Sequence, residues 1–192
     1  VPIKAHANNS IPAQVCSGRF ASPRYWEPVL ANPKYRLLRL NLAHFGGFDE
    51  TRHPIKKCPD PTGDDWEMVI AEMVARYPTL YFDLGYWIEV LNPSGEDAED
   101  VMKRMEVLLA MSPEVVDRMM YGSDWSMIGR EPGHNRYKQS VQTALEKLFP
   151  GDKDKQSGVL GNNALRYLGV RRGSRQWDRL APFFKDNVVF NE

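Results

Sequence analysis

The 192-residue chain has no excess of charge of either sign, because 25 lysines and arginines balance 25 aspartates and glutamates. Proteins that bind nucleic acid or anionic membranes usually carry a basic excess, so we expect neither partner. The sequence also contains no apolar run of transmembrane length and no charged-then-apolar leader segment at its start. These observations leave an ordinary globular protein as the expected class.

Cysteine is scarce as well. The two cysteines, Cys16 and Cys58, fall in different loops and have no CxxC spacing. Two scattered cysteines in a chain of this size are typical of a reduced, intracellular protein. The sequence therefore predicts a cytoplasmic location and no disulfide framework.

The length suffices for one domain with a real core, since a chain of this size buries roughly 70% of its unfolded surface. We expect a single domain over residues 1–192, with an aromatic-bearing helical tail over about 174–192 that packs on something. The chain opens on Val1, without a methionine and inside an apolar run. This start suggests a piece of a longer protein.

Apolar runs of strand length alternate with helical patterns along the chain. The predicted strands cover residues 1–6, 35–44, 79–87 and a fourth run that begins at Met119; the predicted helices cover residues 23–33, 65–77, 96–119, 135–149 and 157–170. Leu38, Leu40 and Leu42 alternate along the second strand, which gives that strand one apolar face. Four strands alternating with helices predict an α/β fold with a parallel sheet and outer helices.

Three of the predicted strands end on residues that can carry chemistry: His6, His44 and Asp124. The carboxyl ends of parallel strands lie on one edge of a sheet, so these side chains should converge there. Neutral imidazole nitrogen and carboxylate oxygen are zinc ligands. Simpler interpretations remain open, because a histidine at a strand end is often a hydrogen-bonded cap and an aspartate after a strand is common in loops.

Further residues near these ends have two interpretations each. Asp83 either joins the site or satisfies loop amides. Gly46 and Gly47 behind His44 either allow close approach of a substrate or form a plain tight turn. Trp87 and Trp125 either wall a substrate pocket or pack in the core or against another subunit. The remaining histidines, His53 and His134, lie in polar loops and are expected to be solvated.

The ordered series PIKAH, LNLAHFGG, LYFDLG, MMYGSDW and VLGNNALRYLGV resembles the C-terminal half of the amidohydrolase superfamily, in the branch of amidohydrolase-related hydrolases and aromatic-acid decarboxylases. The resemblance implies a (β/α)8 barrel in which His6 matches the metal ligand ending strand five. His44 matches the strand-six histidine that contacts substrate or the metal-bound water, and Asp124 matches the aspartate ending strand eight. The closing helix of the family is matched by four residues: Asn163, Ala164, Leu168 and Gly169.

One family feature is missing, because no pair of histidines here has the His-x-His spacing found at the end of strand one. A complete barrel also needs about 250 residues. We therefore expect the C-terminal part of a (β/α)8 TIM barrel, with about four parallel strands and outer helices. An exposed half barrel should associate with the missing N-terminal half or with a second copy as a homo-oligomer.

The resemblance implies a metal-dependent hydrolase that uses one divalent ion, expected to be zinc, held by His6 and Asp124. A metal-activated water would attack a carbonyl-type carbon of a small, aromatic or non-aromatic substrate. Asp124 would accept the proton of that water and His44 would polarise the carbonyl oxygen. Two ligands are fewer than the usual three, so the fragment alone should hold metal poorly and be inactive.

Two alternatives to the hydrolase stay open at this point. The same groups could decarboxylate an aromatic or unsaturated carboxylic acid, by protonating or hydrating a carbon of the substrate. The scaffold could also serve as a non-catalytic binding or assembly module, with the aromatic tail as its contact surface.

Overall fold

The computed structural model describes residues 2–8, 18–47 and 65–185, and the statements below refer to these ranges. Cys16, Cys58 and His53 lie outside them. None of the helices within these ranges combines the length and apolar character needed to cross a lipid bilayer.

Four strands form one sheet in the order β1-β2-β3-β4, and every neighbouring pair is parallel. The strands are β1 (Pro2–His6), β2 (Arg39–Ala43), β3 (Leu80–Asp83) and β4 (Met119–Met120). The register aligns Ala5 with Leu42, Leu42 with Phe82, and Phe82 with Met119. The predicted α/β fold with four parallel strands is confirmed.

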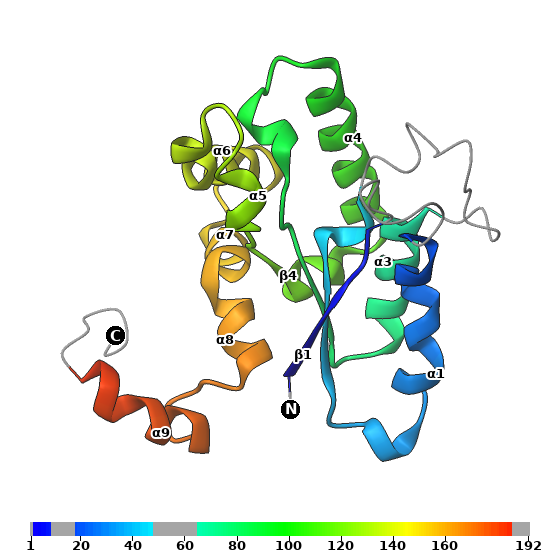
Figure 1. Ribbon diagram of the computed structural model, residues 1–192, viewed down its shortest axis with the longest axis vertical. Helices are drawn as coiled ribbons and strands as arrows, with labels where there is room; N and C mark the ends of the chain where they lie inside the picture. Colours follow the sequence, from blue (N-terminus) through cyan, green and yellow to red (C-terminus); the bar gives the residue numbers. More distant parts are fainter. Residues whose placement is uncertain (1, 9–17, 48–64, 186–192) are drawn as a thin grey trace.

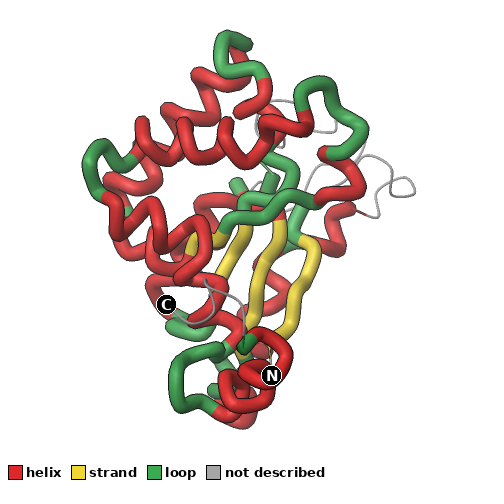
Figure 2. The backbone as a smooth tube through the Cα atoms, turned by 90° about the vertical axis from the view of Figure 1, so that its left-hand side faces the viewer, coloured by secondary structure: helices red, strands yellow, loops and turns green. Residues whose placement is uncertain are grey.

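Helices and short helical turns fill the connections and surround the sheet (Figures 1 and 2). The α-helices are α1 (Glu27–Leu30), α3 (Trp66–Arg76), α4 (Glu96–Met111), α5 (Trp125–Ile128), α6 (Tyr137–Leu148), α7 (Lys153–Ser157), α8 (Asn163–Leu168) and α9 (Arg175–Phe184). The 3-10 helices are Gly18–Ala21, Pro23–Trp26, Pro33–Tyr35, His44–Gly46, Ile88–Leu91, Pro113–Arg118 and His134–Arg136, and a π-helix covers Gly158–Asn162.

The main core lies between one face of the sheet and the helices. The face is apolar because alternate strand residues point the same way, and its central members Leu40, Leu42, Leu80 and Phe82 are fully buried. Helices α3, α4 and α6 contribute the facing side chains: Val69, Ile70, Met73, Val101, Met105, Leu108, Val141 and Leu145. This layer fixes the positions of the strands and therefore of their carboxyl ends.

The opposite face of the same strands is polar. It carries Lys4 on β1, Asn41 on β2 and Asp83 on β3, and both Asn41 and Asp83 are buried. Nearer the amino end of the sheet, Tyr81 packs against Tyr167 of α8 with ring centroids 5.5 Å apart. The alternation therefore separates an apolar core from a polar interior surface within single strands.

The fourth strand is much shorter than predicted. Hydrogen bonding of β4 to β3 ends with the bond from Leu84 N to Met120 O, and the carbonyl oxygen of Leu84 accepts the hydroxyl of Tyr137. On the other edge of β4, Tyr121 N donates to Val159 O of the π-helix at 2.7 Å. The backbone then leaves the sheet, and Asp124 adopts a left-handed conformation before α5. Asp124 is thus held by a turn after the strand rather than by the strand itself.

The other strand limits also contract. The predicted strand 35–44 begins only at Arg39, because Leu38 N donates to Tyr35 O at 2.8 Å and closes a turn before it. The predicted strand 79–87 ends at Asp83, where the carboxylate accepts the amide of Gly85 and folds the chain back. A backbone turn thus delays the start of β2 and a polar side chain ends β3, both inside runs that the apolar pattern alone extends too far.

Helix α9 covers the first part of the predicted tail and lies away from the sheet, at the lower left of Figure 1. Ser174 caps it by accepting a hydrogen bond from Trp177 N at 3.1 Å. None of its residues is buried within the described structure, and Phe183 is 80% exposed.

Candidate active site at the carboxyl end of the sheet

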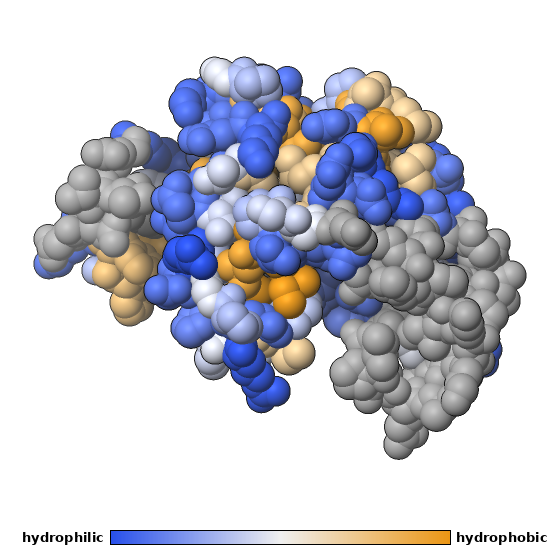
Figure 3. All heavy atoms as spheres, turned by 90° about the horizontal axis from the view of Figure 1, so that it is seen from above, coloured by the Kyte–Doolittle hydropathy of each residue, from blue (hydrophilic) through white to orange (hydrophobic). Residues whose placement is uncertain are grey.

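The ends of the parallel strands bring the two predicted histidines together. His6 ends β1, His44 follows β2, and their rings meet edge to face with centroids 4.7 Å apart. The register explains the contact, since His6 pairs with Ala43, directly before His44. We call the residues that follow or end the strands here (His6, His44, Phe45, Gly85, Tyr86 and Asp124) the rim. Seen from above, this end of the molecule shows an apolar patch near its centre, surrounded by hydrophilic residues (Figure 3).

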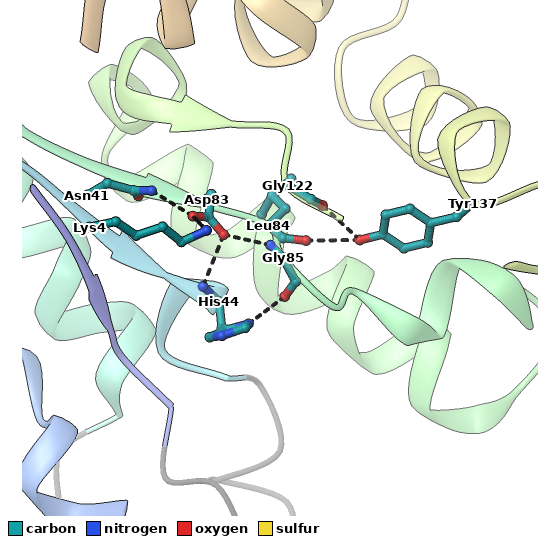
Figure 4. Close-up of polar contacts among 8 residues, drawn as sticks. All are labelled: Lys4, Asn41, His44, Asp83, Leu84, Gly85, Gly122 and Tyr137. Atoms are coloured by element: carbon teal, nitrogen blue, oxygen red, sulfur yellow. Dashed lines mark hydrogen bonds and ion pairs between the residues drawn. The ribbon is translucent and has the colours of Figure 1, made fainter. Parts of the chain in front are cut away.

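The hydrogen bonding of His44 fixes its tautomer. Its Nδ1 lies 2.9 Å from the carbonyl oxygen of Gly85 (Figure 4). A carbonyl oxygen can only accept, so Nδ1 carries the proton and Nε2 of the neutral ring is unprotonated. His44 is therefore set up to accept a proton at Nε2.

His6 is exposed on the edge strand, yet the protein around its ring changes the pKa of the imidazole. Loss of solvent, and next the neighbouring His44, lower the pKa of His6, while the carboxylates of Asp124 and Asp83 oppose this shift. The lowered pKa favours the neutral imidazole, which is the form that binds a metal ion. The opposing effect of Asp124 also shows that its carboxylate lies within electrostatic reach of His6.

Asp124 occupies the turn between β4 and α5. It has φ 48° and ψ 57°, and its Oδ1 accepts a hydrogen bond from Ser126 Oγ at 3.3 Å. Its side chain is partly exposed, which leaves room for further contacts. The structure therefore places Asp124 on the same rim as the two histidines.

Backbone strain is concentrated at the rim. Among the described residues, the non-glycine residues with positive φ are His44 at 69°, Phe45 at 46°, Tyr86 at 59° and Asp124 at 48°. All four follow the carboxyl end of β2, β3 or β4. Such conformations are costly for residues with side chains and tend to cluster at functional sites. Their common location supports the rim as the functional end of the sheet.

Asp83 satisfies loop amides, which is one of the two interpretations left open by the sequence. It is 2% exposed and accepts hydrogen bonds from Gly85 N at 2.9 Å and Asn41 Nδ2 at 2.7 Å. Lys4 Nζ lies 3.0 Å from its Oδ2 and supplies the opposite charge. Buried carboxylates require such partners, so Asp83 is an internal hub behind the rim (Figure 4).

Tyr137 of α6 ties two strand ends together. Its buried hydroxyl shares its hydrogen between Leu84 O at 3.0 Å and Gly122 O at 3.1 Å, and accepts from Trp87 N at 3.0 Å. Burial raises the pKa of Tyr137, so the hydroxyl stays protonated and able to donate. The segments after β3 and β4 are thereby held side by side.

The two predicted substrate-binding tryptophans lie in contrasting surroundings. Trp87 is 3% exposed and lines a cavity of about 520 Å³ between the 3-10 helix Ile88–Leu91, α4 and α6. Trp125 begins α5 and is 81% exposed. The structure therefore buries Trp87 after β3 and leaves Trp125 exposed after β4. The other expected solvated histidine, His134, is exposed.

The donor chemistry of His6 and Asp124 suits zinc, since one supplies an imidazole and the other a carboxylate. Within the described residues, however, no group of three or more histidine, cysteine, aspartate or glutamate side chains could hold a metal ion. A catalytic zinc normally takes three protein ligands. His6 and Asp124 therefore fit a divalent ion only as two members of a larger ligand set.

The family model described as amidohydrolase matches residues 5–170, which include the whole rim. The chain belongs to the amidohydrolase family. No curated protein matches it. Two crystal structures of an amidohydrolase from Burkholderia multivorans, one with bound zinc and one with bound HEPES, resemble it at 19% identity and a TM-score of 0.48. The match covers 74% of this chain and 48% of that protein, so the chain spans about half the length of that amidohydrolase.

Three residues that organise this amidohydrolase rim were missed from the sequence: Lys4, Asn41 and Tyr137. Two of them carry a usable signal. Lys4 precedes His6 by two positions, which places both on one face of β1. Asn41 interrupts the apolar run of β2 and alternates with Leu40 and Leu42, which places its amide on the polar face. Tyr137 carries no such signal, because only the tertiary fold brings α6 to the strand ends.

Proposed function

We propose that this chain is the C-terminal part of a metal-dependent hydrolase of the amidohydrolase type, and that its four strands form half of a (β/α)8 barrel. The observation that carries the proposal is the contact of His6 with His44 at the carboxyl end of a parallel sheet, within a chain that belongs to the family. Ligands of α/β enzymes bind at this end of the strands. The substrate would be a small molecule with a carbonyl-type carbon.

His6 and Asp124 would contribute to holding a divalent ion, preferably zinc, with the remaining ligands supplied by the other half of the barrel. When bound, such an ion supplies Lewis acidity for the hydrolysis of carbonyl compounds. The lowered pKa of His6 keeps its nitrogen available as a ligand at neutral pH. Asp124 would orient the attacking water and accept its proton.

His44 would act beside them through Nε2. Because its Nδ1–H is donated to Gly85 O, Nε2 can take over the proton that Asp124 removes from the attacking water and then donate it to the leaving group, which restores both residues. This assignment differs from the simple polarising role inferred from sequence, since a neutral Nε2 has no hydrogen to donate to a carbonyl oxygen. The same nitrogen could instead deliver a proton to carbon in a decarboxylase.

The test is an Asp124→Asn substitution in the metal-loaded, full-length protein, assayed on esters, lactones and amides and, separately, on aromatic carboxylic acids. We expect turnover to fall at least about 100-fold while the fold is retained, because the amide keeps the shape and removes the base. Asp117→Asn, an exposed site on the 3-10 helix Pro113–Arg118, is the matched control and should keep its activity.

Product analysis separates the candidate reactions, since hydrolysis yields a new acid whereas decarboxylation releases carbon dioxide. Near-normal turnover of Asp124→Asn would reject the assigned role of this residue. Absence of turnover on either class by the metal-loaded parent protein would favour a non-catalytic binding module.

A further inference from the structure

The two carboxylate oxygens of Asp83 have different hydrogen-bond partners. Oδ2 is held from behind by Asn41 Nδ2 at 2.7 Å and Lys4 Nζ at 3.0 Å. Oδ1 faces the rim and accepts Gly85 N at 2.9 Å and, more weakly, His44 N at 3.4 Å. Four donors thus surround a side chain that is 2% exposed, and one side of it is turned toward the rim (Figure 4).

The two contacts of Oδ1 reach His44 by two routes. One route is direct, through the main-chain amide of His44. The other passes through Gly85, whose amide donates to Asp83 and whose carbonyl oxygen accepts the Nδ1–H of the His44 ring. The positions of the main chain and of the imidazole ring of His44 therefore both depend on Oδ1 of Asp83.

The surroundings of Oδ1 leave little space for movement. A Cβ placed on Gly85 would lie 2.8 Å from Oδ1, and one placed on Gly122 would lie 2.9 Å from it. Contacts under 3.0 Å essentially never occur for real Cβ atoms, so both glycines make room for the carboxylate. The turn that it holds is strained as well, with φ 69° at His44. A strained turn persists only where neighbouring groups over-determine it.

We propose that Asp83 is the positioning residue of His44. Its Oδ1 fixes the His44 turn and the Gly85 carbonyl together, and this selects the ring tautomer with the proton on Nδ1 and the lone pair on Nε2. Asp83 itself lies behind the rim and does not touch the substrate. The catalytic consequence rests on the proposed function of His44, whereas the effect on the tautomer is a property of the chain alone.

The substitution Asp83→Asn tests the proposal, because an amide keeps the shape but replaces one acceptor oxygen by a donor. The readout is the ¹⁵N NMR spectrum of His44 in the full-length protein, assigned by comparison with a His44→Gln variant, at a pH where the ring is neutral. We expect the parent protein to carry the proton on Nδ1 and Asp83→Asn to shift the population toward Nε2–H.

The kinetic readout is the division between kcat and KM. A displaced His44 should lower kcat by about 100-fold, with KM within about threefold, since Asp83 does not contact the substrate. Lys4→Met is a matched control that removes an Oδ2 partner and leaves the Oδ1 contacts; its His44 tautomer should match the parent. An equal tautomer shift in Lys4→Met would reject the claim that Oδ1 of Asp83, and not Oδ2, positions His44.

A second variant covers the case in which Asp83→Asn does not fold. Gly122→Ala keeps the carboxylate and presses a methyl group on Oδ1, so it should produce a tautomer shift of the same sign. Gly161→Ala is its control, because a Cβ there meets nothing within 4 Å. An unchanged His44 tautomer in folded Asp83→Asn or folded Gly122→Ala would refute the proposal even if the enzyme is an active hydrolase. A shifted tautomer in a protein without turnover would support the positioning role and reject the proposed function.

Discussion

The two faces of the same strands are stabilised by different kinds of interaction. On β2 and β3, Leu42 and Phe82 are fully buried against the helices, while Asn41 and Asp83 on the opposite face are 4% and 2% exposed. The first face is stabilised by apolar burial, which is non-directional and roughly proportional to area. The second depends on directional hydrogen bonds and an ion pair between buried polar groups, and there the Oδ1 of Asn41 has no hydrogen-bond partner. Side chains on the two faces are therefore almost equally buried, yet the two faces should tolerate substitutions to different degrees.

The comparison has a functional meaning. An apolar face can exchange one hydrocarbon side chain for another of similar volume at modest cost. A polar face tolerates no such exchange, because the loss of one partner leaves another buried group unsatisfied. Stability of the chain should therefore respond most to the apolar face, and the geometry of the rim most to the polar face.

The largest loss of stability is expected for Phe82→Ala on the apolar face. Phe82 is fully buried and stacks on Phe45 with ring centroids 4.1 Å apart. Removing the ring should lower the free energy of unfolding by about 3–5 kcal/mol, measured by equilibrium urea unfolding. Leu37→Ala, at a site 76% exposed, should change it by less than about 0.5 kcal/mol. Equal effects of the two substitutions would contradict the assignment of the core.

An intermediate loss is expected for Tyr137→Phe, which removes one hydroxyl from behind the rim. The ring can stay in place, but Trp87 N loses its acceptor inside the protein. The free energy of unfolding should fall by about 1–3 kcal/mol in urea unfolding at neutral pH. A neutral effect would mean that water replaces the hydroxyl.

This variant should also differ in its dependence on pH. Burial raises the pKa of Tyr137, so an unfolded chain, in which tyrosine ionises near pH ~10, releases this proton first. The parent protein should therefore lose stability as pH rises above about 10, and Tyr137→Phe should lack this part of the loss. Urea midpoints on both sides of that pH give the measurement.

The smallest effect on stability is expected for Trp125→Ala, at the exposed start of α5. The free energy of unfolding should change by less than about 0.5 kcal/mol, because the side chain is 81% exposed. If Trp125 stacks on the substrate, a loss of about 0.5–1.5 kcal/mol of contact raises KM about twofold to tenfold with kcat unchanged. Phe183→Ala on α9, with 80% exposure, is the matched control. An unchanged KM in Trp125→Ala would remove this residue from the substrate site.

Sequence reasoning performed well where a feature is periodic. Alternating leucines predict β2 and its buried face, and alternation of strands with helices predicts the parallel sheet. Parallel order then suffices to place His6 and His44 at a common edge without further information. These inferences need only the repeat of a strand and the direction of the chain.

The remainder depends on contacts that have no local signature. β4 ends where the carbonyl oxygen of Leu84 accepts the hydroxyl of Tyr137 and Tyr121 N donates to Val159 O of the π-helix, two partners far along the chain. The tautomer of His44 depends on the carbonyl of Gly85, and the bracing of the strand ends depends on Tyr137. Apolar patterns overestimate strand length for this reason, since a tertiary hydrogen bond can end a strand inside an apolar run.

The ion pair between Lys4 and Asp83 also acts on the alignment of the sheet. The pair spans from β1 to β3, across the strand between them. Because side chains alternate between faces, sliding β1 by one residue would turn Lys4 toward the helices and leave a buried carboxylate without its cation. The same slip would turn His6 away from His44. The ion pair therefore favours the native strand register, because an alignment that loses the contact between the histidines also loses the cation that neutralises Asp83.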